Sequence, residues 1–206
     1  MVSTEYLAKE INFDVSNKKL LEEIINYGLN LGADFVEIFL ENTDNISVLV
    51  EEDFITSVSP SFGKGAGIRI FKDKRDGFVS TNDLSKDGLI KSVSQAVQML
   101  DITETSSNGK FQGLEDLRNY SKRKNDWLKN LPLVDEIGEK LLLSTASLKK
   151  DPKVNIRKSS YARNWQQVLI ASSDGTFAKD IRLHQTVGLN LIATDRQYRS
   201  SGSRRF

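Results

Sequence analysis

Apolar and polar residues alternate with a period of two over much of this 206-residue chain. In Asp34–Glu41 the alternate positions hold Val36, Ile38 and Leu40, which a strand would place on one face of a sheet. Further short runs of strand type cover residues 46–51, 54–59, 65–72, 78–82, 154–163, 166–172, 177–184, 186–193 and 198–203. Turn-forming residues separate these runs, so we expect antiparallel strands joined by short connections.

Three sites interrupt the early strand pattern. Asn42–Asn45 is polar, and we expect a turn there that returns the chain as the strand Ile46–Glu51. Pro60 should end the strand that begins at Phe54, because proline cannot donate a ladder hydrogen bond. Gly63–Gly67 lies between two expected strands rather than before a helix, so it fits neither a phosphate loop nor a dinucleotide fingerprint. A bulge or close backbone packing is the favoured interpretation.

Helical spacing appears in three segments. Ser16 can cap a first helix that stops near Gly32, Ser85 can cap a second, and a third covers about residues 132–148. The first half therefore combines helices with an antiparallel sheet, and the second half continues as a helix and a β-rich antiparallel meander. These features predict an α+β fold.

Net charge changes sign along the chain. Residues 1–115 contain 11 Lys+Arg and 19 Asp+Glu, a balance of −8, whereas residues 116–206 contain 18 and 9, a balance of +9. Together with the polar segment 101–126, this predicts an N-terminal α+β domain at 1–115 and a helix-plus-β domain at 116–206. Solvated faces explain the basic half, and binding of an acidic ligand or nucleic acid is the alternative.

The residues that commonly carry catalysis are scarce. His184 is the only histidine and cysteine is absent, whereas a zinc site needs three or four ligands at suitable spacing. We therefore assign no catalytic, cofactor-binding or metal-binding residue. Arg75–Val79 offers one aromatic residue for base stacking, which disfavours nucleic-acid recognition. The carboxylate pairs Glu51–Glu52 and Asp73/Asp76 are typical of solvated turns.

No apolar run approaches the roughly 20 residues that a membrane helix requires. Residues 1–13 lack the basic start and apolar stretch of a signal peptide. The lack of cysteine excludes disulfides and fits a cytoplasmic protein.

Several segments together resemble the TldD/PmbA family, peptidases once described as modulators of DNA gyrase. The segments that carry this resemblance, in family order, are Gly32–Ile38, Gly65–Ile70, Gly77–Thr81 with Leu84, Asp151–Val154, Val168–Gly175 and Arg199–Ser203. They extend over nearly the whole chain, from about Leu20 to Phe206.

The resemblance implies an N-terminal α+β domain, a central β-rich domain and a later catalytic domain with an HExxxH zinc site. It also implies cleavage of peptides or unfolded segments by homodimers or paired TldD and PmbA subunits. No HExxxH motif occurs in this sequence. The chain is thus expected to be the non-catalytic, truncated front of a zinc metallopeptidase that binds no zinc by itself. The alternative is a stand-alone binding or assembly module that pairs with a full-length relative. In either case, the last strand, 198–203, is expected to form an open sheet edge for an extended peptide or a second copy.

Overall fold

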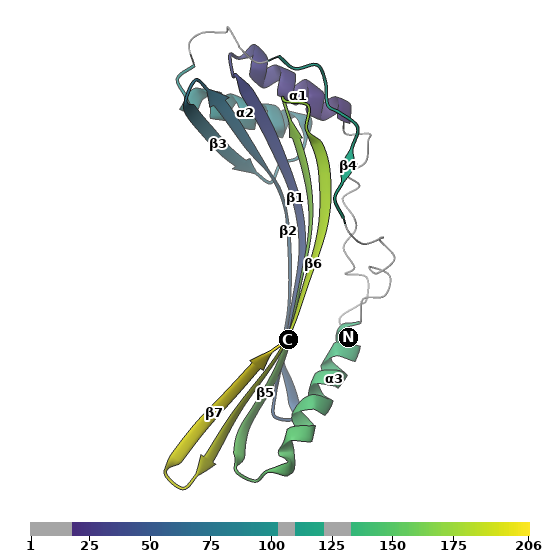
Figure 1. Cartoon of the computed structure of the whole chain (residues 1–206), viewed down its shortest axis with the longest axis vertical. Helices are drawn as coiled ribbons and strands as arrows, with labels where there is room; N and C mark the ends of the chain where they lie inside the picture. Colours follow the sequence, from purple (N-terminus) through teal and green to yellow (C-terminus); the bar gives the residue numbers. More distant parts are fainter. Residues whose placement is uncertain (1–17, 103–109, 122–132) are drawn as a thin grey trace.

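The computed structural model describes residues 18–102, 110–121 and 133–206. Within them the chain combines helices with one curved sheet (Figure 1), which confirms the α+β prediction. The elements are α1 (Lys18–Asn30), β1 (Phe35–Glu51), β2 (Phe54–Lys72), β3 (Arg75–Thr81), α2 (Lys86–Met99), β4 (Arg118–Asn119), α3 (Val134–Ser147), η3 (Leu148–Lys150), β5 (Val154–Ser172), β6 (Phe177–Asp195) and β7 (Tyr198–Arg205).

The sheet has the strand order β3-β2-β1-β5-β6-β4, and β7 pairs with β6. All neighbours are antiparallel except β4, which runs parallel to β6. Two meanders, β1-β2-β3 and β5-β6-β7, are joined where β1 pairs with β5 from Glu37–Ser172 to Glu51–Lys158. The predicted meander in the second half is confirmed. The division at residues 115/116 stays a prediction, and the sheet continues across it.

The predicted turn at Asn42–Asn45 is wrong. These residues lie in the middle of β1, paired with β2 on one side and β5 on the other. Their side chains also find partners across the sheet: the Asn164 amide donates to Asn45, and the Arg163 guanidinium pairs with Asp44 at 3.4 Å. The actual hairpin turn comes after Glu51, where Glu52 adopts a positive φ of 54°. Polar residues stay in the strand because the neighbouring strands satisfy them.

Pro60 does not end a strand. β2 runs through it to Lys72, and β3 pairs with β2 only from Ala66 onward. Pro60 therefore lies on an open edge of the described sheet, where a missing N–H is tolerated. The predicted breaks in the second half, at 164–165 and at 185, are also absent, because β5 and β6 each run unbroken through them.

Two helices cover one end of the sheet. α1 ends where Gly32 adopts a φ of 97°, as its sequence position predicted, and the Ser85 hydroxyl caps α2 by accepting from the Gly88 N–H at 3.1 Å. Both helices pack on the face of β1 that carries Val36 and Ile38, which are fully buried. We call this cluster the upper core.

α3 covers the other end of the same face. Its Ile137 and Leu141 pack against Ile46, Val48 and Val50 of β1 and Tyr161 of β5. We call this smaller cluster the lower core. Figure 1 shows α3 lying along the sheet far from α1 and α2, with the long strands connecting the two regions.

The stretch between the two cores is polar, and we call it the waist. Its central contact is the ion pair of Asp44 and Arg163, whose side chains are only 5% and 7% exposed. Trp165 and Gln167 extend the waist along β5 and are also buried. Arg163 Nε, Trp165 Nε1 and Gln167 Oε1 have no hydrogen-bond partner among the described residues. Removing one partner of a polar contact in the waist is therefore expected to lower the free energy of unfolding.

Candidate functional site

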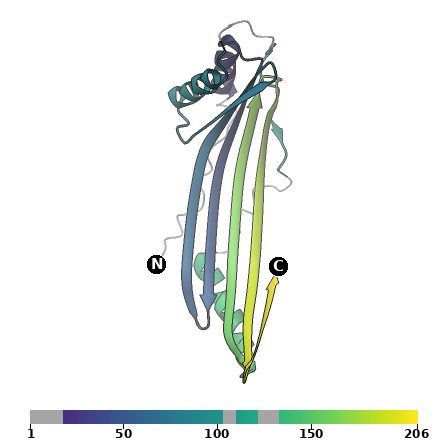
Figure 2. The same cartoon turned by 90° about the vertical axis from the view of Figure 1, so that its left-hand side faces the viewer.

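The face of the sheet opposite the helices is hydrophilic. No helix of the described segments packs on it along the long strands, as Figure 2 shows. Hydrogen bonds between strands order its polar side chains: Gln166 Nε2 donates to Glu41 Oε1 at 2.8 Å, and Arg182 Nη1 donates to Gln166 Oε1 at 3.4 Å. Because these contacts join β1, β5 and β6, the side chains of this face form an ordered polar surface that another molecule could contact.

A hollow of about 390 Å³ opens on this face where β1, β2 and β3 meet. The residues that line it include the glycines Gly63, Gly65 and Gly67 and the aromatic residues Phe39 and Phe78. A side chain on Gly67 would come within 3.0 Å of the Phe78 ring, and one on Gly65 within 3.0 Å of the Thr81 carbonyl oxygen. The glycines therefore keep the space open and let Phe78 lie close to β2.

The lining of the hollow suits an extended segment with an apolar side chain. The rings of Phe39 and Phe78 offer apolar contact, and Glu41 and Asn82 add acceptors. Its volume falls within the range of small-ligand sites.

The hollow brings together segments that the sequence singled out separately. Gly63–Gly67 runs within β2 without a bulge, so close packing is the correct interpretation of the two that were open. Phe78, noted only as an isolated aromatic, packs on Gly67. The sequence analysis missed Phe39 and Asn82. Phe39 reaches the hollow through its pairing with Gly67, a register that sequence periodicity does not supply.

The other candidates are dispersed over the sheet. His184 is exposed in the middle of β6, opposite Asn164. Asp76 pairs with Arg69 at 3.6 Å, and Glu51 pairs with Lys158 at 2.9 Å. The Arg157 side chain donates a hydrogen bond to the Glu52 carboxylate. This hydrogen bond lowers the pKa of the Glu52 carboxyl below its usual range.

Zinc is the metal that the family resemblance implies. The described segments contain no group of three His, Cys, Asp or Glu residues able to hold a metal ion. His184 lies opposite Asn164 of β5, so the residue that pairs with it across the described strands is not a carboxylate. These residues do not fit a zinc site. Also among the described residues, no helix is long and apolar enough to cross a membrane.

The edges of the described sheet that have no neighbouring described strand include parts of β2 and β7. No other described strand pairs with the outer side of β2 at the residues before Ala66, where the pairing with β3 ends. Among the described strands β7 pairs with β6 alone, and its residues are exposed; its use as an edge for a peptide or a second copy stays a prediction. Open edges present unpaired N–H and C=O groups that can receive an extended chain.

Comparison with known proteins agrees with this architecture. The family model for "PmbA/TldA metallopeptidase domain 1" matches residues 36–100, and the model for the "PmbA/TldA metallopeptidase central domain" matches residues 128–206. Among curated proteins, no match was found.

Three solved structures share the fold at low sequence identity. One, a candidate modulator of DNA gyrase from Bacteroides thetaiotaomicron, has 19% identity, a TM-score of 0.71 and coverage of 93% of this chain. TldE from Thermococcus kodakarensis has 18% identity, a TM-score of 0.71 and 90% coverage. A second candidate gyrase modulator, from Thermotoga maritima, has 17% identity, a TM-score of 0.68 and 91% coverage.

The match spans only 45%, 42% and 42% of these three chains, respectively. The two family models together cover well over half of this chain, in the order expected for the first and central domains. The chain therefore belongs to the PmbA/TldD metallopeptidase family.

Proposed function

We propose that this chain acts as the non-catalytic front part of a TldD-like zinc metallopeptidase. In this role it forms part of the wall of the peptidase chamber and holds peptides or unfolded segments. A separate domain then supplies the zinc and the chemistry, because the described residues do not fit a zinc site. Family membership and the span of less than half of the related structures support this division of labour.

The hollow beside Phe78 is the observation that carries the peptide-holding role. It combines an apolar wall with acceptors on an otherwise polar face, beside an open stretch of β2. An extended peptide could place one apolar side chain in the hollow while its backbone pairs with the sheet edge. Binding of this kind tolerates many sequences, because backbone hydrogen bonds supply much of the affinity.

Peptide binding can be measured by fluorescence anisotropy with a short labelled unfolded peptide that contains apolar residues. We expect saturable binding that Phe78→Ala weakens by roughly tenfold, since truncating a well-placed aromatic contact costs on the order of 1–2 kcal/mol. Met99→Ala is the matched control: Met99 is 63% exposed and ends α2, outside the hollow. Equal affinity of the native chain and Phe78→Ala would contradict the assignment.

The division of labour requires its own test. The chain alone should hold no stoichiometric zinc by elemental analysis and should leave unfolded peptides uncut. Peptide cleavage should appear only when a zinc-bearing family member is added. One tightly bound zinc per chain, or cleavage by the chain alone, would refute the proposal.

A further inference from the structure

The hollow combines aromatic rings with a carboxylate. Glu41 lines it together with Phe39, which lies two residues earlier on the same face of β1. Lys64 also lines the hollow, but its side chain belongs to the other face of the sheet. Ala66 is buried in the upper core, and strand alternation places Lys64, two residues away, on that same helix-covered face. The charged side chain on the side of the hollow is therefore that of Glu41.

Glu41 has no basic residue opposite it in the sheet. It lies between Gly65 of β2 and Val168 of β5. Its hydrogen-bond partner is a neutral amide, since Gln166 Nε2 donates to Oε1 at 2.8 Å. Within the described part of the chain the Glu41 carboxylate forms no ion pair. A half-buried carboxylate with only a neutral partner keeps both its charge and spare acceptor sites for a cation.

Two arginines on the same face have carboxylates of their own. Arg182 pairs with Asp180 at 2.8 Å. Arg69 pairs with Asp76 at 3.6 Å, and its guanidinium carbon lies 5.8 Å from the centre of the Phe71 ring. Both guanidinium groups are thus engaged elsewhere, and the charge of Glu41 is left for a ligand.

Aromatic rings beside a carboxylate suit a cation on an apolar stem. The faces of the Phe39 and Phe78 rings attract a cation, and the Glu41 carboxylate can accept a charge-assisted hydrogen bond from it. Phe39 and Glu41 are two residues apart, or about 7 Å along the strand, which is comparable to the reach of the four-carbon stem of lysine. A wholly apolar side chain would cover the rings but would take water away from Glu41 without pairing its charge.

The glycines leave a path to Glu41 from the edge of the sheet. Gly63 and Gly65 lie on the same face of β2 as the hollow and present no side chain there. Gly63 also precedes Ala66, where the pairing of β2 with β3 ends. A side chain of a peptide lying along this part of β2 can therefore cross the glycines and reach Glu41.

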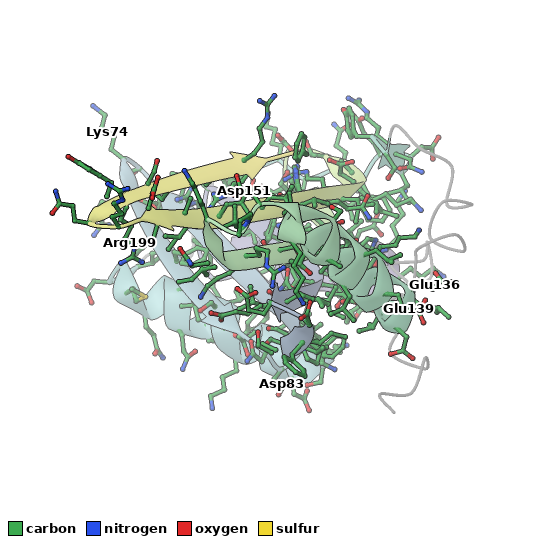
Figure 3. The ribbon with its side chains drawn as sticks, turned by 90° about the horizontal axis from the view of Figure 1, so that it is seen from below. Lys74, Asp83, Glu136, Glu139, Asp151 and Arg199 are labelled. Atoms are coloured by element: carbon green, nitrogen blue, oxygen red, sulfur yellow. The ribbon has the colours of Figure 1, made fainter. Side chains whose placement is uncertain are left out.

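Exposed carboxylates elsewhere lack this combination. Glu136 and Glu139 belong to α3, on the helix-covered side of the sheet, as Figure 3 shows. Both side chains are exposed, and neither lines the hollow. Their attraction for a cation is screened by solvent and salt, so they provide a comparison for the charge of Glu41.

We propose that the hollow selects a basic side chain of the bound segment, lysine or arginine. The stem lies against Phe39 and Phe78, and the cationic group pairs with Glu41. This inference rests on the peptide-holding role proposed above and names the class of residue that the hollow takes. The free amine at a peptide's N-terminus is a second source of positive charge, but it brings no stem to cover the rings.

Peptides that differ at one position test this selection by fluorescence anisotropy. Two labelled, N-acetylated peptides carry either lysine or norleucine, which keeps the four-carbon stem without the charge. We expect the lysine peptide to bind about fivefold to tenfold more tightly. Glu41→Gln should remove this difference while it keeps an acceptor for Gln166. Glu139→Gln is the matched control, because it changes the net charge equally but should keep the preference for lysine.

The norleucine peptide separates this inference from the peptide-holding role. It should bind Glu41→Gln at least as tightly as the native chain, which also shows that the variant is folded. Equal binding of both peptides to the native chain, with Phe78→Ala weakening both, would overturn the selection and leave the peptide-holding role intact. Binding of neither peptide would overturn both.

Two further outcomes would assign the preference to another group. A preference for lysine that persists in Glu41→Gln would show that the hollow is not its source. A norleucine peptide with a free N-terminal amine that binds as tightly as the acetylated lysine peptide would assign the hollow to chain ends. Either result would overturn the selection of a basic side chain.

Discussion

The upper and lower ends of the long sheet use the same strands but different amounts of apolar cover. At the upper end α1 and α2 both pack on β1 and β2, and Val36, Ile38 and Ile68 are fully buried. At the lower end α3 alone covers β1 and β5, and the cluster is much smaller. The strands nevertheless stay paired throughout. Backbone pairing thus holds the sheet together along its length, whereas most of the hydrophobic stabilisation is concentrated at one end.

The waist separates these two regions, and its ion pair should give the largest effect. Asp44→Asn leaves the buried Arg163 guanidinium without its carboxylate, which typically costs about 3–5 kcal/mol. Urea denaturation would measure the loss of unfolding free energy. Asp180→Asn is the control, because Asp180 pairs with Arg182 at a more exposed site where about 1 kcal/mol or less is at stake. A cost for Asp44→Asn no larger than that of the control would show that the waist is not a buried electrostatic site.

The two cores can be compared within one strand. Ile38 and Ile46 lie on the same face of β1, one in the upper core and one in the lower core. Ile38→Ala should lower the free energy of unfolding by about 4 kcal/mol and Ile46→Ala by about 2 kcal/mol. The difference is expected because the densely packed surroundings of Ile38 relax less into the cavity than those of Ile46. Unfolding free energies from the same denaturant series would check both values. Equal costs would mean that the lower core is as well packed as the upper core.

Helix packing makes the upper end less tolerant of added volume. A methyl group on Gly77 would lie 2.6 Å from the Ala96 carbonyl oxygen of α2, so β3 and α2 would have to separate. We expect Gly77→Ala to cost about 1–3 kcal/mol. Gly202→Ala in β7 meets nothing within 4 Å and should be nearly neutral. Thermal melting of both variants distinguishes them, and a neutral Gly77→Ala would contradict this close approach.

The difference between local signals and contacts of residues far apart in the sequence explains which structural features could be predicted. The helices and the β2–β3 hairpin were predictable because their signals are local: the Ser85 cap, Gly32 and the turn after Lys72. The length of β1 was not, because Asp44 and Asn45 are satisfied by Arg163 and Asn164, residues 119 positions away. A polar run with partners on distant strands looks like a turn when read alone.

The hollow was predictable only in part. Gly63–Gly67 indicated close packing, and Phe78 was visible as an aromatic residue in an expected strand. Gly67 and Phe78 come together because of the β2–β3 register, in which Gly67 pairs with Ser80. The Phe78 ring then packs on Gly67. Phe39 arrives from β1 by a second register. Sequence periodicity identifies strands, but neither register follows from it.

The smallest expected effect concerns pH and the tip of the lower end. The Arg157 side chain donates to Glu52 Oε2 at 2.9 Å, and this hydrogen bond is the main cause of the lowered pKa of Glu52. A carboxyl whose pKa is lower in the folded state contributes stability above its unfolded value, near 4.5, and loses that contribution as pH falls through the folded value. The native chain should therefore have a higher Tm than Glu52→Gln at about pH 7, and the difference should shrink toward about pH 3.

Hydrogen exchange can locate this effect on the sheet. The pair joins the β1–β2 turn to β5, since the Glu52 N–H also donates to the Arg157 carbonyl oxygen at 2.9 Å. Acid should therefore increase exchange in the lower strands first, because the small lower core offers little other support there. Amides around Ile38 in the upper core should keep their protection until global unfolding. If acid instead loosened both ends together, the sheet would behave as one cooperative unit, and the waist would not separate two regions of unequal stability.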